Sequence, residues 1–336
     1  MTTKRISEID ILYTFGAILA VFGHSHPNDW SVFDGTFLYH TINFIYTFHM
    51  PLFFLITGIL LANSKSVERK PFGLFIKEKA FKLLTPYIVL SLLFIFPKGY
   101  IEHGNFQFLN VEYLIKVIFS PRHNVWGHFW FLPVLFVCYV IFGTFKKYIL
   151  KNVKSAFALT AVTVLTFVMI LLSKYTTDWF AIADIFKFAF YIPFGMLLLP
   201  WLKNHKQLNA SLLIILALSP LLISGVLYAF LYRFILAQFI ISLLMFVSLS
   251  SAAKLIGEKF NGFFSYFGKN VFTVYIYSWP FQSIALMVLE KINPIWQINV
   301  ILVFIVGIIC PLAISVIYGK LQKMHCKFLD LLLGMR

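Results

Sequence analysis

Long apolar runs, each of about 20 residues, recur along the whole chain between shorter polar stretches, and each is long enough to cross a bilayer as a helix. The pattern predicts ten spans at about 8–26, 40–62, 80–98, 128–146, 155–173, 179–201, 208–227, 230–252, 264–289 and 295–318. The seventh and eighth of these are separated by a very tight turn.

The composition supports a helical membrane protein. The 336-residue chain is 60% hydrophobic and 12% charged, with a mean hydropathy of +0.85. A transmembrane barrel would show short alternating segments rather than long apolar runs. We therefore expect an all-α polytopic membrane protein, with residues 1–336 forming a single integral-membrane domain.

The basic residues gather in alternate connections, which predicts the orientation of the spans. These connections and the C-terminal stretch hold Lys65, Arg69, Lys70, Lys77, Lys79, Lys146, Lys147, Lys151, Lys154, Lys203, Lys206, Lys254, Lys259, Lys269, Lys320, Lys323, Lys327 and Arg336. Both termini are therefore expected in the cytoplasm. The membrane itself is expected to be a bacterial cytoplasmic membrane. The formal net charge of +15 reflects this topology and does not indicate a nucleic-acid partner.

The N-terminus resembles a signal peptide, because Lys4 and Arg5 precede an apolar run. Glu8 and Asp10 interrupt that run, however, and no cleavage site of small residues follows. We expect a retained first span.

The connection 99–127 is the longest on the opposite side, and its segment NVEYLIKVIFS predicts a short interfacial helix. Cys138, Cys310 and Cys326 show neither metal-ligand spacing nor a clear disulfide pairing, so no metal is expected.

Ionisable residues in the first two spans are the main candidates for chemistry. Asp10 and His24 lie in the first span and His49 in the second. Such a residue costs about 2.5 kcal/mol or more inside a membrane and commonly marks a site. On a helix, Tyr13 and His24 share one face, roughly 16 Å apart along the axis, with Asp10 on nearly the same stripe. His24 is the acid/base candidate, since imidazole titrates near neutral pH.

A plainer alternative is that one of these histidines caps a helix end or bonds a neighbouring backbone carbonyl. Pro51, close to His49, removes a backbone hydrogen bond and leaves the carbonyl near Thr47 without its amide. A kink is expected there, and Thr57 and Gly58 should allow close approach of another helix.

Several blocks of the sequence occur in a recognisable order. The first two spans contain IDILYTFGAILAVFGHS and FHMPLFFLITGIL, followed by KAFKLLTPY, HFWFLPVLF, FAFYIPFGMLL and FSYFGKNVFTVYIYSWP. From end to end these blocks resemble those of the acyltransferase 3 family, integral-membrane O-acyltransferases that typically acylate cell-surface sugars. The block FHMPLFF is the most specific match.

The resemblance implies that an acyl-CoA, usually acetyl-CoA, binds from the cytoplasm as co-substrate. It also implies that a histidine moves the acyl group to a hydroxyl of a surface polysaccharide or its lipid-linked precursor. His24 occupies the family's catalytic histidine position, Asp10 would orient or balance charge near the donor, and His49 is the second catalytic candidate. Membrane lipids are the other expected partner.

Two positions depart from the family pattern. Tyr13 stands where the family has a basic residue, and tyrosine offers only a neutral hydrogen bond to the cofactor. Arg5 or the pair Lys79 and Lys82 could substitute for the phosphate-binding part. Ser278 stands where the family has a later histidine, so Ser278 and Tyr277 would only shape the pocket.

Other candidates have a functional and a plain interpretation. Lys79 and Lys82 could bind the phosphates of CoA or serve only as topology determinants. His128 and Trp130, at the outer end of the fourth span, could contact a sugar or belong to the interfacial aromatic belt.

Further along the chain, Arg233 is expected just inside the eighth span, where it could bind an anionic acceptor or reach lipid headgroups. Asp184 and Lys187, three residues apart, are expected to neutralise each other. Trp279 and the proline after it are expected to form a packing kink.

A membrane O-acetyltransferase is the leading hypothesis. The alternative is a proton-coupled transporter or flippase for a polysaccharide or small solute, in which Asp10, His24 and His49 form a proton relay. The absence of an inverted repeat and of paired broken helices favours the enzyme. A scaffold without catalysis leaves the cost of the intramembrane histidines unexplained.

Overall fold

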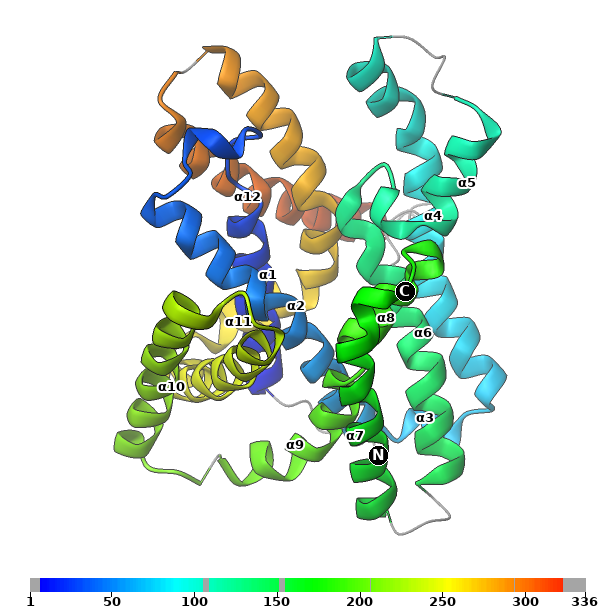
Figure 1. The fold of residues 1–336 in the computed structure, drawn as a ribbon, viewed down its shortest axis with the longest axis vertical. Coiled ribbons are helices and arrows are strands. Elements are labelled where there is room, and N and C mark those ends of the chain that lie inside the picture. The colour runs from blue at the N-terminus through cyan, green and yellow to red at the C-terminus, as the bar shows by residue number, and fades with distance from the viewer. Residues whose placement is uncertain (1–6, 105–108, 151–154, 206, 293, 323–336) are drawn as a thin grey trace. The chain divides into compact units, whose positions relative to one another are not determined.

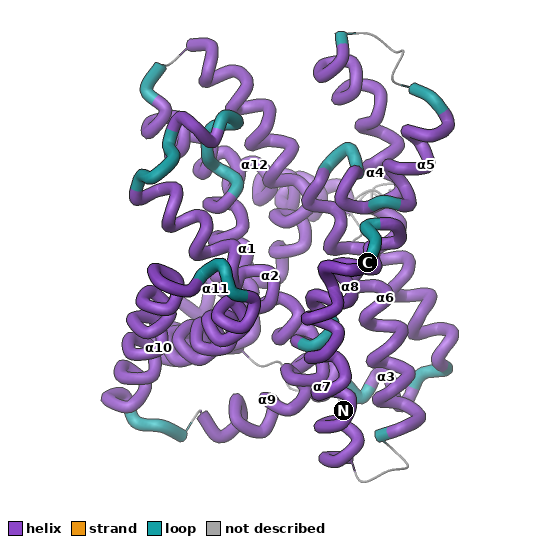
Figure 2. The backbone as a smooth tube through the Cα atoms, in the orientation of Figure 1, coloured by secondary structure: helices purple, strands orange, loops and turns teal. Residues whose placement is uncertain are grey.

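The computed structural model describes residues 7–104, 109–150, 155–205, 207–292 and 294–322. Within these ranges the chain is helical and contains no strand, which confirms the all-α prediction (Figure 2). The α-helices are α1 (Ser7–Gly23), α2 (Phe37–Asn63), α3 (Ser66–Arg69), α4 (Phe72–His103), α5 (Val111–Phe119), α6 (Phe131–Thr144), α7 (Ser155–Leu172), α8 (Ile182–Phe188), α9 (Tyr191–His205), α10 (Ala210–Leu231), α11 (Ile235–Ile292) and α12 (Trp296–Gln322).

Nine segments of the described chain are long and apolar enough to cross a membrane: Phe37–Asn63, Phe72–Tyr100, Gly127–Ile149, Ala156–Tyr175, Trp179–Asn204, Ala210–Leu231, Ile235–Gly257, Gly262–Ile292 and Trp296–Tyr318. Helix α1 is a tenth apolar helix of 17 residues, at the short end of spanning lengths. The prediction of about ten spans is confirmed, and the protein is a multi-pass membrane protein. The cytoplasmic location of both termini stays a prediction.

The chain divides into two compact units. Unit 1 consists of Met1–Ile56 and Leu198–Ile317, and unit 2 of Thr57–Leu197 and Tyr318–Arg336. Helices α2, α9 and α12 therefore each pass from one unit to the other. The single domain expected over the whole chain stays a prediction.

In unit 1, α11 packs along both α1 and α10 (Figure 1). Ile45 and Phe48 of α2, Tyr228 of α10, and Ile241 and Met245 of α11 form a buried apolar cluster that joins three of the helices. The predicted tight turn between the seventh and eighth spans is confirmed, because only three residues separate α10 from α11.

Helix α11 differs from the sequence prediction. A connection was expected between residues 252 and 264, but the break is shorter: the backbone is non-helical at Phe260, where φ is −118° and ψ is 23°, and the spans Ile235–Gly257 and Gly262–Ile292 lie on either side of it. Beyond this break Gly268 lies against α1: a Cβ at Gly268 would lie 2.8 Å from the Cβ of Asp10. The glycine of the GKN block therefore permits close packing of the first and ninth spans.

In unit 2, α4 packs against α6. The expected close approach at Gly58 is confirmed, because a Cβ there would lie 2.1 Å from the carbonyl oxygen of Ile192. Helix α5 coincides with the short helix predicted between residues 99 and 127. Its N-terminus is capped by Asn110, whose Oδ1 accepts from the amide of Tyr113 at 2.8 Å.

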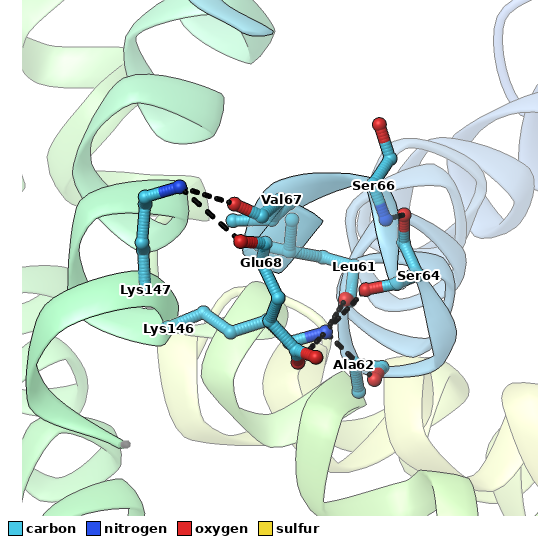
Figure 3. Close-up of polar contacts among 8 residues, drawn as sticks. All are labelled: Leu61, Ala62, Ser64, Ser66, Val67, Glu68, Lys146 and Lys147. Atoms are coloured by element: carbon cyan, nitrogen blue, oxygen red, sulfur yellow. Dashed lines mark hydrogen bonds and ion pairs between the residues drawn. The ribbon is translucent and has the colours of Figure 1, made fainter. Parts of the chain in front are cut away.

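Two lysines after α6 hold the C-terminal ends of α2 and α3 (Figure 3). The Lys146 Nζ donates to the carbonyl oxygens of Leu61, Ala62 and Ser64 at 2.8, 3.0 and 2.6 Å. The next lysine, Lys147, donates to carbonyls of the following turn at Val67, Glu68 and Lys70. The two lysine ammonium groups donate to carbonyls that lack an intrahelical donor. Lys146 and Lys147 therefore have a structural role besides any effect on topology.

Candidate functional site

His24 is the first residue beyond α1. Its backbone amide lies 3.2 Å from the carbonyl oxygens of both Ala20 and Val21, so the last turn of the helix still holds its backbone. The side chain is half-buried in unit 1. Helix α1 thus presents an imidazole at its C-terminal end.

Tyr46 of α2 orients this imidazole. Its hydroxyl donates to the carbonyl oxygen of Gly23 at 2.6 Å and lies 3.4 Å from the Nδ1 of His24. The missing Cβ of Gly23 makes room for the phenol, because a Cβ would lie 2.8 Å from the Tyr46 Cε1. Since the single phenol proton is directed at Gly23, the oxygen is free to accept from Nδ1–H of His24. That tautomer carries its lone pair on Nε2.

Trp279 of α11 covers the same imidazole. The ring centroids of His24 and Trp279 are 4.1 Å apart, with 36° between their planes. The sequence predicted a packing kink at Trp279 and gave no indication of this contact. Tyr277 and Ser278 directly precede it on α11, Tyr277 half-buried and Ser278 buried.

His49 also lies beside Tyr46, with 5.4 Å between the ring centroids. Its side chain is buried, and its Nδ1 lies 3.0 Å from the carbonyl oxygen of Ile45, one turn earlier in α2. Because a carbonyl only accepts, Nδ1 carries the proton. The structure therefore brings His24, Tyr46 and His49 together, and His49 forms the backbone bond that the plainer alternative described.

Asp10 and Tyr13 lie away from His24 along α1. Fourteen residues of helix place Asp10 about 21 Å from His24 along the axis, where it faces Gly268. The ring of Tyr13 lies 5.9 Å from that of Phe53. The predicted roles of Asp10 in charge balance and of Tyr13 toward the cofactor stay predictions.

In unit 2, His128 and Trp130 lie on the 3-10 turn Gly127–Trp130 directly before α6, and both are buried. The Trp130 ring stacks on Phe188 at 5.1 Å, and the guanidinium carbon of Arg122 lies 4.1 Å from its centroid. A sugar contact at Trp130 stays a prediction, and these neighbours would have to move to permit it.

Arg122 also forms a bidentate ion pair with the buried carboxylate of Asp184. The Arg122 Nε lies 2.9 Å from Oδ2 and Nη2 lies 2.5 Å from Oδ1. The sequence paired Asp184 with Lys187 alone, and the structure adds Arg122 as the partner that forms the ion pair with Asp184. Lys187 lies over the Phe188 ring. Sequence spacing within one helix could not reveal a partner 62 residues away.

The remaining cationic candidates lie on different elements. Lys79 and Lys82 are on α4, and the Lys79 Nζ lies 4.0 Å from the ring centroid of Tyr139 on α6. Arg233 lies in the turn before α11 rather than inside a span, which corrects its predicted position. Its Nε donates to the hydroxyl of Tyr232 at 3.3 Å.

Within the described ranges, no three His, Cys, Asp or Glu side chains gather in a way that could hold a metal ion. Cys138 and Cys310 are free thiols. Arg5 and Cys326, two residues of interest in the sequence, lie outside the described residues.

Comparison with protein families agrees with the blocks found in the sequence. A family model described as an acyltransferase domain matches residues 6–320, nearly the whole chain. The chain belongs to the acyltransferase 3 family. The suspected resemblance is confirmed, and together with the spanning helices it identifies a membrane acyltransferase. Comparison with curated proteins and with solved structures gives no significant match.

Three residues around the acyltransferase's His24 were not singled out as site residues from the sequence: Tyr46, Trp279 and Gln282. A partial signal existed for Tyr46, which lies three residues before His49 and so shares its helix face. Gln282 offered another signal, as an amide within an apolar span. Trp279 and Gln282 reach the turn of His24 only through tertiary packing of α11 against α1, across most of the chain.

Proposed function

We propose that the protein transfers an acyl group, with acetyl as the expected group, from cytoplasmic acyl-CoA to a hydroxyl of a surface polysaccharide or its lipid-linked precursor. His24 acts as general base. The observation that carries this assignment is the arrangement of His24 between Tyr46 and Trp279 at the end of α1.

The chemistry needs one proton to move twice. Nε2 of His24 takes the proton of the acceptor hydroxyl while that oxygen attacks the thioester carbonyl. The new O–C bond forms, the C–S bond breaks, and the imidazolium returns the proton to the departing CoA thiolate. The products are an ester and free CoA thiol.

The neighbours of His24 support this role. The contact with Tyr46 favours the tautomer with its lone pair on Nε2, as a positioned partner does for the histidine of a catalytic triad. The indole of Trp279 restricts rotation of the ring. A restricted base loses less entropy on reaching the transition state.

The test follows release of free thiol by protein in proteoliposomes that is given acetyl-CoA and a panel of glycans. We expect turnover in the wild type and at least a 10²-fold loss in His24→Ala, by analogy with the about 10²- to 10⁴-fold contribution of acid–base catalysis. His40→Ala, at an exposed histidine of α2, is the matched control and should retain turnover.

Two other outcomes count against the proposal. Turnover that survives in His24→Ala but is lost in His49→Ala moves the base to His49. A wild type that releases no thiol with any donor, yet carries a glycan or solute across the vesicle membrane, supports transport instead.

A further inference from the structure

The turn that carries His24 is bonded to α11 by one buried side chain. Gln282 is 1% exposed. Its Nε2 donates to the carbonyl oxygen of Val21 and to the Oγ of Ser25, each at 2.8 Å. These two acceptors flank His24 in the sequence, so a single amide group spans the turn on which the imidazole sits.

The donor and acceptor roles in this network follow from chemistry alone. The Val21 carbonyl can only accept, so the nitrogen of the Gln282 amide must face it. The Ser25 hydroxyl directs its one proton to the same carbonyl at 2.8 Å. Its oxygen therefore accepts from Gln282. The three groups form a closed triangle with one consistent arrangement of hydrogens.

The other atom of the amide indicates why glutamine is present. Gln282 Oε1 is buried and has no hydrogen-bond partner within the described part of the chain. A buried carbonyl without a donor opposes folding. An apolar side chain would avoid that penalty, so the two bonds from Nε2 supply a compensating advantage at the His24 turn.

We call Gln282 and its two acceptors, Val21 and Ser25, the clamp. Two further contacts hold the clamp and the imidazole in place. Trp279 lies one helical turn before Gln282, on the same face of α11, and packs on His24. From α12, a Cβ at Gly307 would lie 2.7 Å from the Val21 Cγ1 and 2.8 Å from the Gln282 Cδ. The backbone of α12 therefore holds the amide in place.

We propose that Gln282 is a positioning residue for acyl transfer: it holds the turn of His24 so that the imidazole stays against Trp279 and Tyr46 in its reactive orientation. The inference rests on the proposed role of His24 as base. Gln282 itself takes no part in proton transfer. Its loss should lower kcat and leave KM for acyl-CoA nearly unchanged, because a misplaced base affects only the transition state.

The principal variant is Gln282→Met, which keeps the length of the side chain and removes both donors. A misplacement of about 1 Å reduces rates about 10²-fold, so we expect kcat to fall by about 10- to 100-fold. The matched control is Gln238→Met in the first turn of α11, whose Nε2 also donates to a backbone carbonyl, that of Tyr232, at 2.8 Å. It should keep wild-type kcat.

A second variant leaves the clamp residues themselves intact. In Gly307→Ala the new methyl group must displace the Gln282 side chain, so kcat should fall in the same way. The matched control is Gly225→Ala in α10, where nothing lies within 4 Å of the new Cβ among the described residues. This pair keeps the test decisive if Gln282→Met does not fold.

A readout independent of turnover is the fluorescence of Trp279, taken as the difference between each protein and its Trp279→Phe derivative. A protonated imidazole against an indole interacts with the ring and quenches its emission. The wild type should show acid quenching that is absent in His24→Ala. Gln282→Met and Gly307→Ala should show a reduced amplitude, and both controls should match the wild type.

The two measurements separate failure of this inference from failure of the proposed function. If His24→Ala keeps turnover while Gln282→Met loses the quenching, the clamp stands and the general-base assignment falls. If Gln282→Met keeps both wild-type quenching and wild-type kcat, Gln282 does not position His24. A fall in kcat with unchanged quenching also overturns the proposal, because the effect then arises elsewhere.

Discussion

The hydroxyl of Ser242 lies 2.9 Å from the carbonyl oxygen of Thr47, which Pro51 leaves without an intrahelical amide. Helix α2 continues unbroken through Pro51, and Ser242 of α11 donates the bond that the proline cannot. The same hydroxyl lies 2.8 Å from the carbonyl oxygen of Gln238, so its proton is shared between two acceptors. Proline and serine thus form a matched pair on neighbouring helices.

Ser242→Ala should lower the free energy of unfolding by about 1 kcal/mol, the net value of a typical hydrogen bond. The loss should be smaller in a Pro51→Ala background, where the alanine amide satisfies Thr47. Denaturant titration in mixed micelles measures both values. Ser219→Ala, which removes only a bond within exposed α10, is the control. Equal losses in the two backgrounds would show that Ser242 and Pro51 are not coupled.

Gly58→Ala should be severely destabilising. The added methyl group would lie 2.1 Å from the Ile192 carbonyl oxygen, and backbone atoms cannot move away cheaply. Overpacking of this kind costs about 1–3 kcal/mol or more. Gly73→Ala in α4 meets nothing within 4 Å among the described residues and should be neutral or slightly stabilising. Thermal unfolding in detergent compares the two, and equal midpoints would contradict the packing.

Lys146→Met should destabilise unit 2, because the carbonyls of Leu61, Ala62 and Ser64 lose their shared donor. We expect a loss of about 2 kcal/mol in the free energy of unfolding, as for bonds to a charged group. Lys77→Met, at an exposed lysine of α4, removes the same charge without these bonds. Cysteine accessibility should show the same orientation for both variants. If Lys146→Met lowers the free energy of unfolding no more than Lys77→Met does, Lys146 acts only as a determinant of topology.

The loop after α1 should be less stable in acid. Burial beside Trp30 and Phe33 lowers the pKa of His26 below its ordinary value of 6.5. The unfolded loop then binds more protons than the folded one just below that value, so stability rises with pH through this window and falls on acidification. Limited proteolysis should cut the loop faster at about pH 5.5 than at about pH 7.5.

The control for that experiment is His26→Asn, which keeps a donor near the carbonyl of Pro27 but cannot titrate. Its rate of cleavage should not depend on the protonation of residue 26. If the wild type and the variant show the same pH dependence, another group of the loop is responsible.

Most of the fold could be predicted from local sequence, because each helix and turn is indicated by the hydrophobic and polar residues of its own segment. The tight turn before α11, the helix α5 and the close approach at Gly58 all follow from a few neighbouring residues. The short break at Phe260 between two helical spans did not follow, since Lys254, Glu258 and Lys259 indicate a longer segment outside the lipid. Hydropathy indicates whether a segment lies in lipid or in water. It does not indicate where a helix ends, because a helix can continue beyond the membrane.

The site was predicted only in its two histidines, His24 and His49. His24 was identified as an ionisable group in an apolar run, which is a local signal. Gln282 bonds Ser25 across 257 residues, and Lys146 bonds carbonyls 82 to 85 residues earlier. A single sequence holds no information on which distant groups meet. Such contacts require the packing of the helices to be known.

The division into two units also constrains how the protein is made. Unit 2 is continuous over Thr57–Leu197, so its helices find their partners soon after synthesis. Helix α1 packs on α11, which leaves the ribosome more than 200 residues later. During that interval the first span waits in the membrane with Asp10 and His24 without α11. An insertase or a membrane chaperone that shelters a polar helix is therefore expected to set the yield of active enzyme.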